Sequence, residues 1–385
     1  MTFRVEERQG LTEAAWEIGA NVSAPAADDV DANARFPEET RAALAQAKIL
    51  SALIPAELGG GGASLSDVSG AIRALAFHCA SSALMLAMHS NEVGQLVQFG
   101  DTPGLRALAG EVAEKQLLIA NANSEVGLGG DATRSNCAVE EIEGVPSLNK
   151  HALACSYGQH ADLLSATARR RPDAEPNDQL VALMRRESLV IEEAGEWNTM
   201  GLRGTCSAPL RFSAKIDPAL VYPVDFAYMG EHGMMARWLI MLSSVWVGLA
   251  EAAVDQAHRH VRKAARRSVG TLPPSATRLA ELQSKLLQSR GALAVALDAY
   301  ARAAAEDHLD DTALLVTVRG LKVATSKLLV DIASEAMSIV GIMGFQRGSG
   351  SLERIVRDAH GSVLMVSNDR YLQANAVALT VLKRI

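Results

Sequence analysis

The sequence predicts a mostly α-helical protein with a small β domain in its middle. The chain has 385 residues, 49% of them apolar and only 4% aromatic, and its abundant Ala and Leu favour helix. Helical periodicity fills the first 120 or so residues and returns after about residue 222. Between these two regions the helical periodicity stops, and short segments with the pattern of β-strands follow one another, separated by Gly and Pro turns. We therefore expect three domains: helical residues 1–120, β residues 121–222 and a helical bundle of residues 223–385.

The N-terminal region is expected to form five helices, because apolar residues recur there at i, i+3, i+4 spacing. A loop with four glycines, Ile54–Ala63, separates the second helix from the third. The predicted helices are Thr12–Val30, Pro37–Ala47, Ser64–Cys79, Ser82–Phe99 and Pro103–Glu111.

The middle region is expected to form short strands, because its apolar runs are brief and bounded by turn residues. The polar, proline-containing segment Arg169–Asp178 indicates a hairpin or a loop. The predicted strands are Ala138–Ile142, Asp162–Ala168, Leu180–Met184, Leu189–Glu193 and Leu210–Ile216.

Long helices with apolar stripes follow, and they predict a four-helix bundle. The most apolar run, Trp238–Ala250, is shorter than the ~20 residues that span a bilayer, so we expect a buried core helix and no membrane insertion. The predicted helices are Met234–Arg266, Thr277–Asp307, Asp310–Ile342 and Asn368–Lys383.

Charge and cysteine usage narrow the class of protein. A formal net charge of −7 argues against a general nucleic-acid or anionic-membrane binder. The four cysteines show no CxxC spacing and no His/Cys ligand cluster surrounds them, so we expect free thiols and no metal site. The first ten residues, MTFRVEERQG, lack the apolar segment of a signal peptide. A cytoplasmic protein is expected.

Three loops carry residues suited to ligand binding. Glycines such as those of Ser124–Asp131 let a backbone approach a flat or anionic ligand, and exposed N–H groups bind phosphate. Lys150–Asp162 has a turn around Ser156, and Trp197–Ser207 has a glycine-rich turn with Arg203. A plain turn or connector is the commoner explanation of each segment taken alone.

Two further features bear titratable groups. His89 lies in an apolar helical run, where a histidine is more often a core residue than a base, although its titration range suits proton transfer. Arg354, Arg357 and Asp358 cluster near the C-terminus, and a solvated helix face is the default interpretation of such a cluster.

The order of the motifs is more specific than any one of them. Seven blocks follow one another: IPAELGG, AMHSN, NSEVGLGGD, KHALACSYGQHAD, WNTMGLRGTCS, IVGIMGF and LERIVRDA. In this order they resemble the acyl-CoA dehydrogenase superfamily from about residue 10 to residue 385. The resemblance implies an N-terminal helical domain, a β-barrel-like middle domain and a C-terminal four-helix bundle. It also implies FAD between the last two domains and a homotetramer, or dimer of dimers, in which a neighbour completes the FAD site.

The resemblance assigns a first group of cofactor residues in the β domain. Ser124 takes the place of a hydroxyl that bonds the pyrimidine edge of the flavin, and Ser156 that of a hydroxyl beside flavin N5. The backbone around Gly127, Gly129 and Gly130 would lie near the flavin and the pyrophosphate. Family members often have a Trp that packs on the ring two residues before Ser156, where this chain has Ala154.

A second group lies near the C-terminus and departs further from the family pattern. Ser338 stands for a Gln, and Gly341 and Gly344 keep only part of a glycine motif. The basic phosphate contact is reduced to Arg266 in RRSVG. FAD is the expected cofactor, and these departures leave FMN or loosely held reduced flavin as alternatives.

The resemblance breaks down at the catalytic base. Family members carry a Glu where this chain has Val366, or on the first bundle helix where it has Trp238. A base must come within about 3 Å of the proton that it removes, and the nearest candidates by sequence are Asp369, Glu231 and His89. Asp369 would equally serve to complement the dipole of the last helix.

Three functions stay open. The first is α,β-desaturation of an acyl thioester, with hydride transfer to flavin N5, a displaced base and electron-transfer flavoprotein as a possible partner. The second is a two-component monooxygenase of the same fold that receives reduced flavin from a separate reductase. The third is a base-less FAD-binding subunit that supports an active partner chain. The sequence specifies neither the chain length of a substrate nor its carrier.

Overall fold

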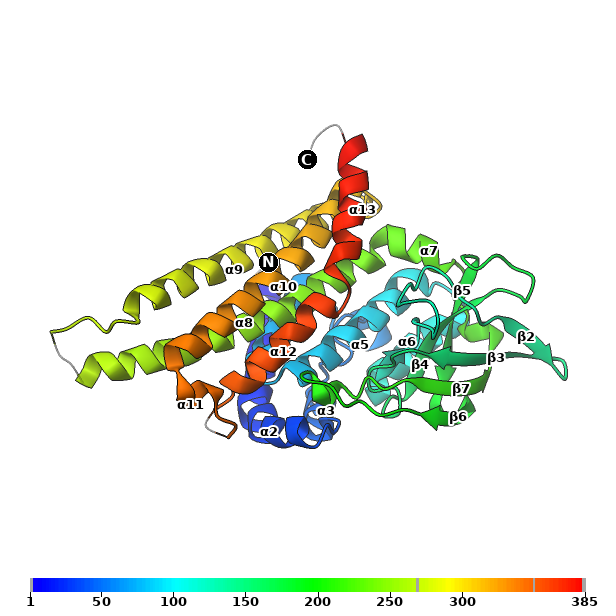
Figure 1. Ribbon diagram of the computed structural model, residues 1–385. Helices are drawn as coiled ribbons and strands as arrows, with labels where there is room; N and C mark the ends of the chain where they lie inside the picture. The colour runs from blue at the N-terminus through cyan, green and yellow to red at the C-terminus, as the bar shows by residue number, and fades with distance from the viewer. Residues whose placement is uncertain (1–2, 268–269, 349, 383–385) are drawn as a thin grey trace.

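The computed structural model describes residues 3–267, 270–348 and 350–382. Helices come first, two small sheets follow, and long helices complete the chain. Figure 1 shows the sheets at one end of the molecule and the long helices running from them towards the other end. This arrangement confirms the predicted fold class.

The N-terminal helices contain one break that the sequence pattern does not show. The predicted helix Thr12–Val30 is divided by a π-helical turn, Gly19–Ser23. A Cβ at Gly19 would lie 2.4 Å from Cδ2 of His78, so only glycine allows this close approach. The elements are α1 (Phe3–Ile18), η1 (Gly19–Ser23), α2 (Ala24–Ala32), α3 (Glu38–Gln46), η2 (Ala56–Leu58), α4 (Leu65–Ala76), α5 (Ala80–Phe99) and α6 (Pro103–Lys115).

The strands form a three-stranded sheet of order β1-β4-β5 and a four-stranded sheet of order β2-β3-β7-β6. β1 runs parallel to β4, with Ile119 opposite Leu163, and the other named pairs are antiparallel. The strands and short 3₁₀ turns are β1 (Ile119–Asn121), β2 (Val139–Ile142), β3 (Val145–Ala152), β4 (Leu163–Arg169), β5 (Gln179–Arg185), η3 (Arg186–Ser188), β6 (Leu189–Ala194), η4 (Arg203–Thr205), β7 (Leu210–Lys215) and η5 (Pro218–Leu220).

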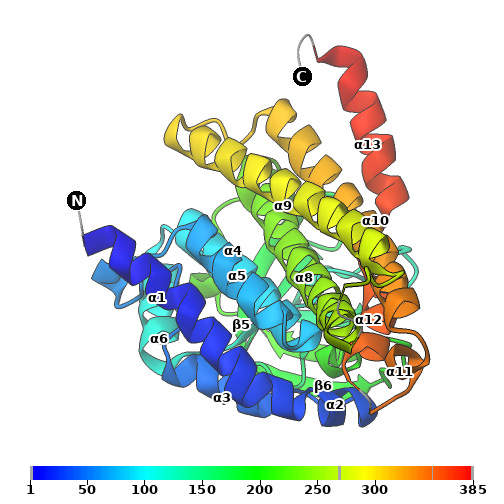
Figure 2. The same ribbon diagram turned by 90° about the vertical axis from the view of Figure 1, so that its left-hand side faces the viewer.

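The C-terminal helices pack around α8, which Figure 2 shows in the middle of the helices. By length and composition the helix Phe226–Arg267 could cross a membrane, but 83% of its most apolar stretch is buried inside the protein. It is a core helix, as Trp238–Ala250 predicts. The elements are α7 (Phe226–Met229), η6 (Gly230–Met234), α8 (Met235–Arg267), α9 (Ala276–Ala305), α10 (Thr312–Val340), α11 (Ile342–Phe345), α12 (Leu352–Leu364) and α13 (Asn368–Val381).

The charged cluster on α12 is a docking surface, so the default interpretation of a solvated face is wrong. Arg357 pairs with Asp31 of α2 at 2.5 Å, and Arg354 pairs with Asp28 of the same helix. Asp358 is buried, and its Oδ1 accepts a hydrogen bond from the backbone N–H of Leu202 at 2.6 Å. These contacts fix α12 to the N-terminal helices and to the segment Trp197–Ser207.

Candidate functional site

Ser124 joins the glycine-rich segment Ser124–Asp131, called here the glycine loop, to the turn that carries Ser156. The Ser124 hydroxyl donates to the carbonyl of Ala154 at 3.1 Å and accepts from the Ala154 N–H at 3.3 Å. The N–H of Leu153 donates to the carbonyl of Ser124 at 3.2 Å. Because these bonds pair the residues after β1 with the residues after β3, the β-domain residues of the first predicted group lie together.

The glycine loop has the open backbone that its composition predicts. Gly127, Gly129 and Gly130 have φ of +89°, +59° and +77°, which glycine adopts without steric cost. Among the described residues, no atom lies within 4 Å of a Cβ built at Gly129 or Gly130. The carbonyls of these two glycines accept hydrogen bonds from Arg370, at 3.3 and 2.7 Å. The start of α13 is thereby tied to the loop.

Ser156 begins a chain of hydroxyl groups with a defined direction. Its Oγ lies 2.7 Å from Oγ of Ser207, which lies 2.7 Å from Oγ1 of Thr205. Thr205 donates to the carbonyl of Leu202 at 2.9 Å. Each hydroxyl has one proton, so all three bonds form only if Ser207 donates to Thr205 and Ser156 donates to Ser207. Ser156 is then left with acceptor capacity alone.

His89 is a core histidine. Its Nε2 donates to the carbonyl of Leu50 at 2.7 Å, and its Nδ1 accepts from the N–H of Ile119 at 3.1 Å. The ring is fully buried, and burial lowers its pKa to about 4. The imidazole is therefore neutral, and both of its nitrogens are hydrogen-bonded to the protein backbone.

The two carboxylates among the predicted bases lie on the surface and in different elements. Asp369 is in the first turn of α13, and Glu231 is in η6, at the joint between α7 and α8. Both side chains are exposed. The structure therefore does not bring Asp369, Glu231 and His89 to one place.

The two positions where family members carry a Glu are apolar and packed. Val366 and Trp238 are partly buried, and both pack against the same two clusters of the core. Beneath the α12–α13 joint, the buried Lys322 of α10 donates to the carbonyl of Val366 and, at 2.7 Å, to Oδ1 of Asn368. Burial lowers the pKa of Lys322 to about 8. Lys322 of α10 thus holds the α12–α13 joint in place, but position 366 itself carries no carboxylate.

The second predicted cofactor group lies at the other end of the molecule. Arg266 is at the end of α8, and Ser338 is two residues before the end of α10. Gly341 and Gly344 follow, at α11. Figure 1 shows these helix ends on the side opposite the sheets. Within one chain the two groups are therefore separated.

Family models settle the relationship that the motif order suggests. The model described as "Acyl-CoA dehydrogenase, N-terminal domain" matches residues 5–103, and that described as "Acyl-CoA dehydrogenase, C-terminal domain" matches residues 228–364. The chain belongs to the acyl-CoA dehydrogenase superfamily. The matched segments include α4, α5, α8 and α10, which form the helical framework of the site.

Similar proteins within the acyl-CoA dehydrogenase superfamily differ in chemistry. Cyclohex-1-ene-1-carbonyl-CoA dehydrogenase of Syntrophus aciditrophicus is 24% identical, covering 93% of this chain and 86% of the relative. Butyryl-CoA dehydrogenase of Megasphaera elsdenii has a TM-score of 0.84 at 19% identity, covering 97% and 98%. FMN-bound TdsC of Paenibacillus sp. A11-2, a dibenzothiophene monooxygenase, has a TM-score of 0.79 at 18% identity, covering 95% and 96%. The fold is thus common to dehydrogenases and a monooxygenase.

The flavin prediction is confirmed at the level of the superfamily fold, since TdsC holds FMN. The residues present in this chain fit such a group. Beside the Ser124 hydroxyl, Val126 and Leu153 are 42% and 41% exposed, and the N–H of Val126 bonds the carbonyl of His151 on the neighbouring segment. An apolar surface edged by a hydroxyl and an open glycine backbone suits a flat ring with a polar rim. The surface formed by Val126, Leu153, Ser124, the glycine loop and the turn of Ser156 is called here the candidate flavin surface.

Sequence reasoning missed Glu92, a buried carboxyl near this surface. Its Oε1 accepts hydrogen bonds from Gln95 at 2.9 Å and from Asn121 at 3.1 Å. Burial raises its pKa to about 7. Asn121 ends β1, three residues before Ser124. The available signal was the polar run Ser90–Glu92 inside an otherwise apolar helix that is buried nearly all round.

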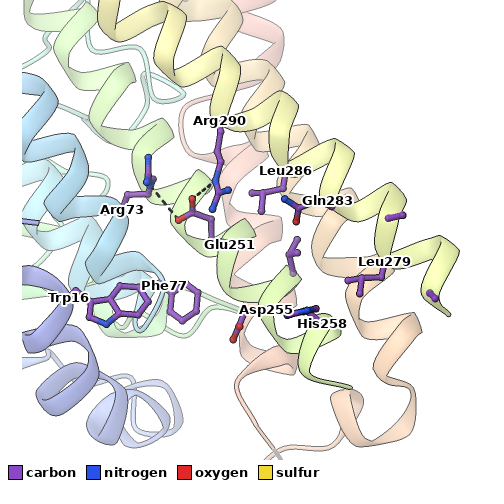
Figure 3. A pocket seen from close by; sticks show the side chains of 13 residues that line it. Trp16, Arg73, Phe77, Glu251, Asp255, His258, Leu279, Gln283, Leu286 and Arg290 are labelled. Atoms are coloured by element: carbon purple, nitrogen blue, oxygen red, sulfur yellow. Dashed lines mark hydrogen bonds and ion pairs between the residues drawn. The ribbon is translucent and has the colours of Figure 1, made fainter. Parts of the chain in front are cut away.

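A separate surface pocket of about 740 Å³ lies between α1, α4, α8 and α9. Figure 3 shows Glu251 between two guanidinium groups, with its oxygens 3.4 Å from Nε of Arg73 and 2.6 Å from Nε of Arg290. Trp16 and Phe77 form an aromatic wall to one side. The lining includes none of the predicted cofactor or base residues, so this pocket is distinct from the candidate flavin surface.

Proposed function

We propose that this protein is a flavin-dependent monooxygenase of the acyl-CoA dehydrogenase fold, which uses reduced flavin to oxygenate a small molecule. The observation that carries the proposal is the apolar character of both base positions. Val366 and Trp238 pack into the core, and neither accepts a proton. Desaturation of an acyl thioester requires a base within about 3 Å of the α-proton, whereas oxygenation does not begin with that proton transfer.

Reduced flavin, when bound, supplies the two electrons with which one atom of dioxygen enters the substrate and the other leaves as water. The chain provides the surroundings for this chemistry. Val126 and Leu153 offer an apolar surface, and Ser124 and the backbone of the glycine loop offer polar contacts to its rim.

The hydroxyl chain at Ser156 supports the reduced form. By its resemblance to the family, this hydroxyl would lie beside flavin N5. Oxidised N5 accepts a hydrogen bond, whereas reduced N5 carries a proton and donates one. Because the proton of Ser156 is used in the bond to Ser207, Ser156 is suited to accept a hydrogen bond from reduced N5.

The cofactor preference and the partners follow from the second residue group. Ser338 replaces a Gln, and Arg266 stands in a reduced phosphate motif, so contacts to the adenine half of FAD are weakened. FMN, exchanged with a separate flavin reductase, is the form that these residues support best. A second copy of the chain would bring its Arg266 end to the glycine loop, as the family's dimer of dimers implies.

A second candidate is desaturation with Asp369 as a displaced base. Asp369 directly precedes Arg370, whose guanidinium contacts the glycine loop. Among the carboxylates considered as bases, Asp369 is therefore the one next to a residue of the flavin surface. Desaturation would deliver electrons to an acceptor such as electron-transfer flavoprotein, and the substrate would be an acyl thioester.

Anaerobic and aerobic assays distinguish the candidates. Under the proposal, the flavin-loaded protein is not bleached by acyl-CoAs of any chain length under anaerobic conditions. With FMN and a flavin reductase it oxygenates an added small molecule, and oxygen is consumed as product forms. Bleaching by an acyl-CoA, lost in Asp369→Asn while flavin stays bound, would establish the second candidate instead. Tight flavin binding without either activity, with activity gained on co-expression of a related chain, would indicate the base-less subunit.

A further inference from the structure

A group of buried polar side chains lies between α5, α8 and the segment that follows η5. It consists of Asn91, Glu92, Gln95, Tyr222 and Arg237, all buried, and is called here the inner polar cluster. Arg237 lies against Gly94 of α5, which stands between Glu92 and Gln95 in the sequence. The charges of Glu92 and Arg237 also act on each other and on Tyr222. Such a cluster is unusual in a protein core, because burying polar groups is costly.

Arg237 enters the core through a gap that a glycine leaves open. A Cβ at Gly94 of α5 would lie 2.3 Å from Nε of Arg237 and 2.8 Å from its Cζ. The guanidinium therefore lies directly on the backbone of α5. Its Nη1 donates to Oε1 of Gln98 at 2.8 Å, while Nε and Nη2 have no partner in the described part of the chain.

The same holds for other atoms of the cluster. Within residues 3–267, 270–348 and 350–382, Oδ1 of Asn91, Oε1 of Gln95 and the hydroxyl of Tyr222 are buried without a hydrogen-bond partner. Leaving one buried polar group unpaired costs about 1–3 kcal/mol, and more when it is charged. Native proteins keep few such groups, so a concentration of them around one guanidinium indicates a binding function.

The free edge of Arg237 specifies the kind of ligand. Nε and Nη2 lie on one side of the guanidinium and present two parallel N–H donors, which match the two oxygens of a carboxylate. We propose that the inner polar cluster binds the carboxylate of a small-molecule ligand, with Arg237 as its bidentate partner. The inference rests on the proposed function only in taking this ligand to be the substrate.

The position of the cluster supports that assignment. Asn121, which donates to Glu92, is three residues from Ser124, and Arg237 directly precedes Trp238 on α8. The carbonyl of Asn121 also accepts a hydrogen bond from the thiol of Cys155, the residue before Ser156, at 3.3 Å. The cluster is therefore linked through Asn121 to the turn that carries Ser156 in the candidate flavin surface. A ligand held there by its carboxylate directs its other end towards that surface. This predicts a substrate with an anionic end, in contrast to a simple fatty acyl group with an apolar end.

Glu92 makes the binding sensitive to pH. Burial raises its pKa to about 7. The other ionisable groups that face it are Arg237 and the phenols of Tyr157 and Tyr222, and burial raises the pKa values of both phenols well above their usual value of 10. Below pH 7 the neutral carboxyl can donate a hydrogen bond to the ligand, and above pH 7 its charge repels the ligand.

Calorimetry on the full chain tests the proposal with benzoate, hexanoate and adipate, each paired with its neutral amide. A carboxylate should bind at least about tenfold more tightly than its amide at pH 6, since charge-assisted bidentate bonds are the stronger kind. Arg237→Gln should abolish this preference, and Arg237→Lys should retain part of it. Glu92→Gln should keep the preference but lose the fall in affinity that the natural protein shows above pH 7.

A matched control identifies where the probe binds. Arg290→Gln changes an arginine of the separate surface pocket and should leave binding unchanged; loss of binding in that variant would place the carboxylate in the surface pocket and overturn the proposal. Equal affinity for carboxylate and amide, or a pH profile that Glu92→Gln does not alter, would do the same. If Arg237→Gln does not fold, the Arg237→Lys and Glu92→Gln profiles decide. None of these measurements depends on turnover, so failure of the monooxygenase proposal would leave them interpretable.

Discussion

At the residue scale, Gly201 allows the segment Trp197–Ser207 to lie directly on α12. A Cβ at Gly201 would lie 2.4 Å from both the carbonyl carbon and the oxygen of Arg357, and 2.6 Å from the N of Asp358. These are backbone atoms of a helix that ion pairs hold in place, so they cannot move aside as the end of a flexible side chain would.

Gly201→Ala should therefore destabilise the protein by about 1–3 kcal/mol, the usual cost of forcing extra volume into a packed contact. Urea unfolding measures the change. Gly291→Ala is the control, because Gly291 lies on the exposed face of α9 with no described atom within 4 Å of an added Cβ. That variant should be unchanged or up to about 1 kcal/mol more stable, since Ala favours helix over Gly. Equal effects of the two substitutions would contradict the steric argument.

Glu92 predicts a second residue-scale effect, on the pH dependence of stability. Its pKa rises from an ordinary 4.5 to about 7 in the folded protein. Between these values the unfolded chain releases the proton and the folded chain retains it, so the free energy of unfolding falls as pH rises through this window. At about 1.4 kcal/mol per pKa unit, the loss approaches ~3 kcal/mol above pH 7.

Glu92→Gln, which does not ionise, should lose correspondingly less stability between pH 4.5 and pH 7.5. Guanidinium unfolding at pH 4.5, 6.0 and 7.5 gives the two profiles. The raised pKa of Asp358 affects both proteins alike and cancels in the comparison. Parallel profiles would show that Glu92 is not the group responsible.

These residues also show what a single sequence reveals at this scale. The sequence alone could show that Val366 stands at the family's Glu position, because that position is found by counting forward from Arg357 and Asp358. The count holds because α12 continues without interruption from these residues to Leu364. The role of His89 could not be predicted in this way, since its partners are the backbone atoms of Leu50 and Ile119. The raised pKa of Glu92 likewise depends on burial by other elements, which no local pattern records.

At the element scale, the joint between α12 and α13 depends on α10. Lys322 is fully buried and donates to the Val366 carbonyl and the Asn368 side chain. Asn368 also donates to the Ser326 hydroxyl at 3.1 Å. One lysine thus fixes the end of one helix relative to the start of the next, and with it Arg370 on the glycine loop.

Lys322→Met should loosen this joint, because two buried acceptors lose a donor at a cost of about 1–3 kcal/mol each. Hydrogen exchange should become faster at residues 365–371, and flavin affinity should fall as Arg370 loses its position. Lys327→Met is the matched control, since Lys327 is exposed on the same helix. Unchanged exchange at the joint in Lys322→Met, or the same acceleration in both variants, would exclude the anchoring role.

Helices could be predicted better than strands, for reasons that particular elements make clear. The capping box of Ser64 and Asp67 marks the start of α4 in the sequence itself. β1 has only three residues and pairs in parallel with β4, more than forty positions away. No hairpin turn in the sequence therefore marks its position. The π-helical turn begins at Gly19, which lies against His78, and this is likewise a contact between distant positions in the chain.

At the scale of the whole molecule, the two groups of predicted cofactor residues lie at opposite ends. Ser124, Ser156 and the glycine loop are on the β domain, while Arg266 and Ser338 are at the far ends of α8 and α10. A cofactor site that uses both groups must combine two chains. In a two-fold symmetric pair each chain then contributes one group to each of two equivalent sites.

Subunit complementation tests this arrangement. Gly129→Asp places a carboxylate in the glycine loop, and Arg266→Glu reverses the charge at the other end, so each variant alone should bind flavin weakly. In a mixed dimer one site carries both changes and the other carries neither. Co-expression at equal levels makes half of the dimers mixed, so about a quarter of the sites should regain full affinity. Flavin bound per chain, measured by absorbance, gives this fraction.

The control is co-expression of Gly129→Asp with Ser124→Asp. Both substitutions lie in the same residue group, so every site of a mixed dimer carries one of them, and no flavin binding should be restored. Flavin binding that stays at the level of the separate variants in the first mixture, although mixed dimers are present, would show that the site lies within one chain.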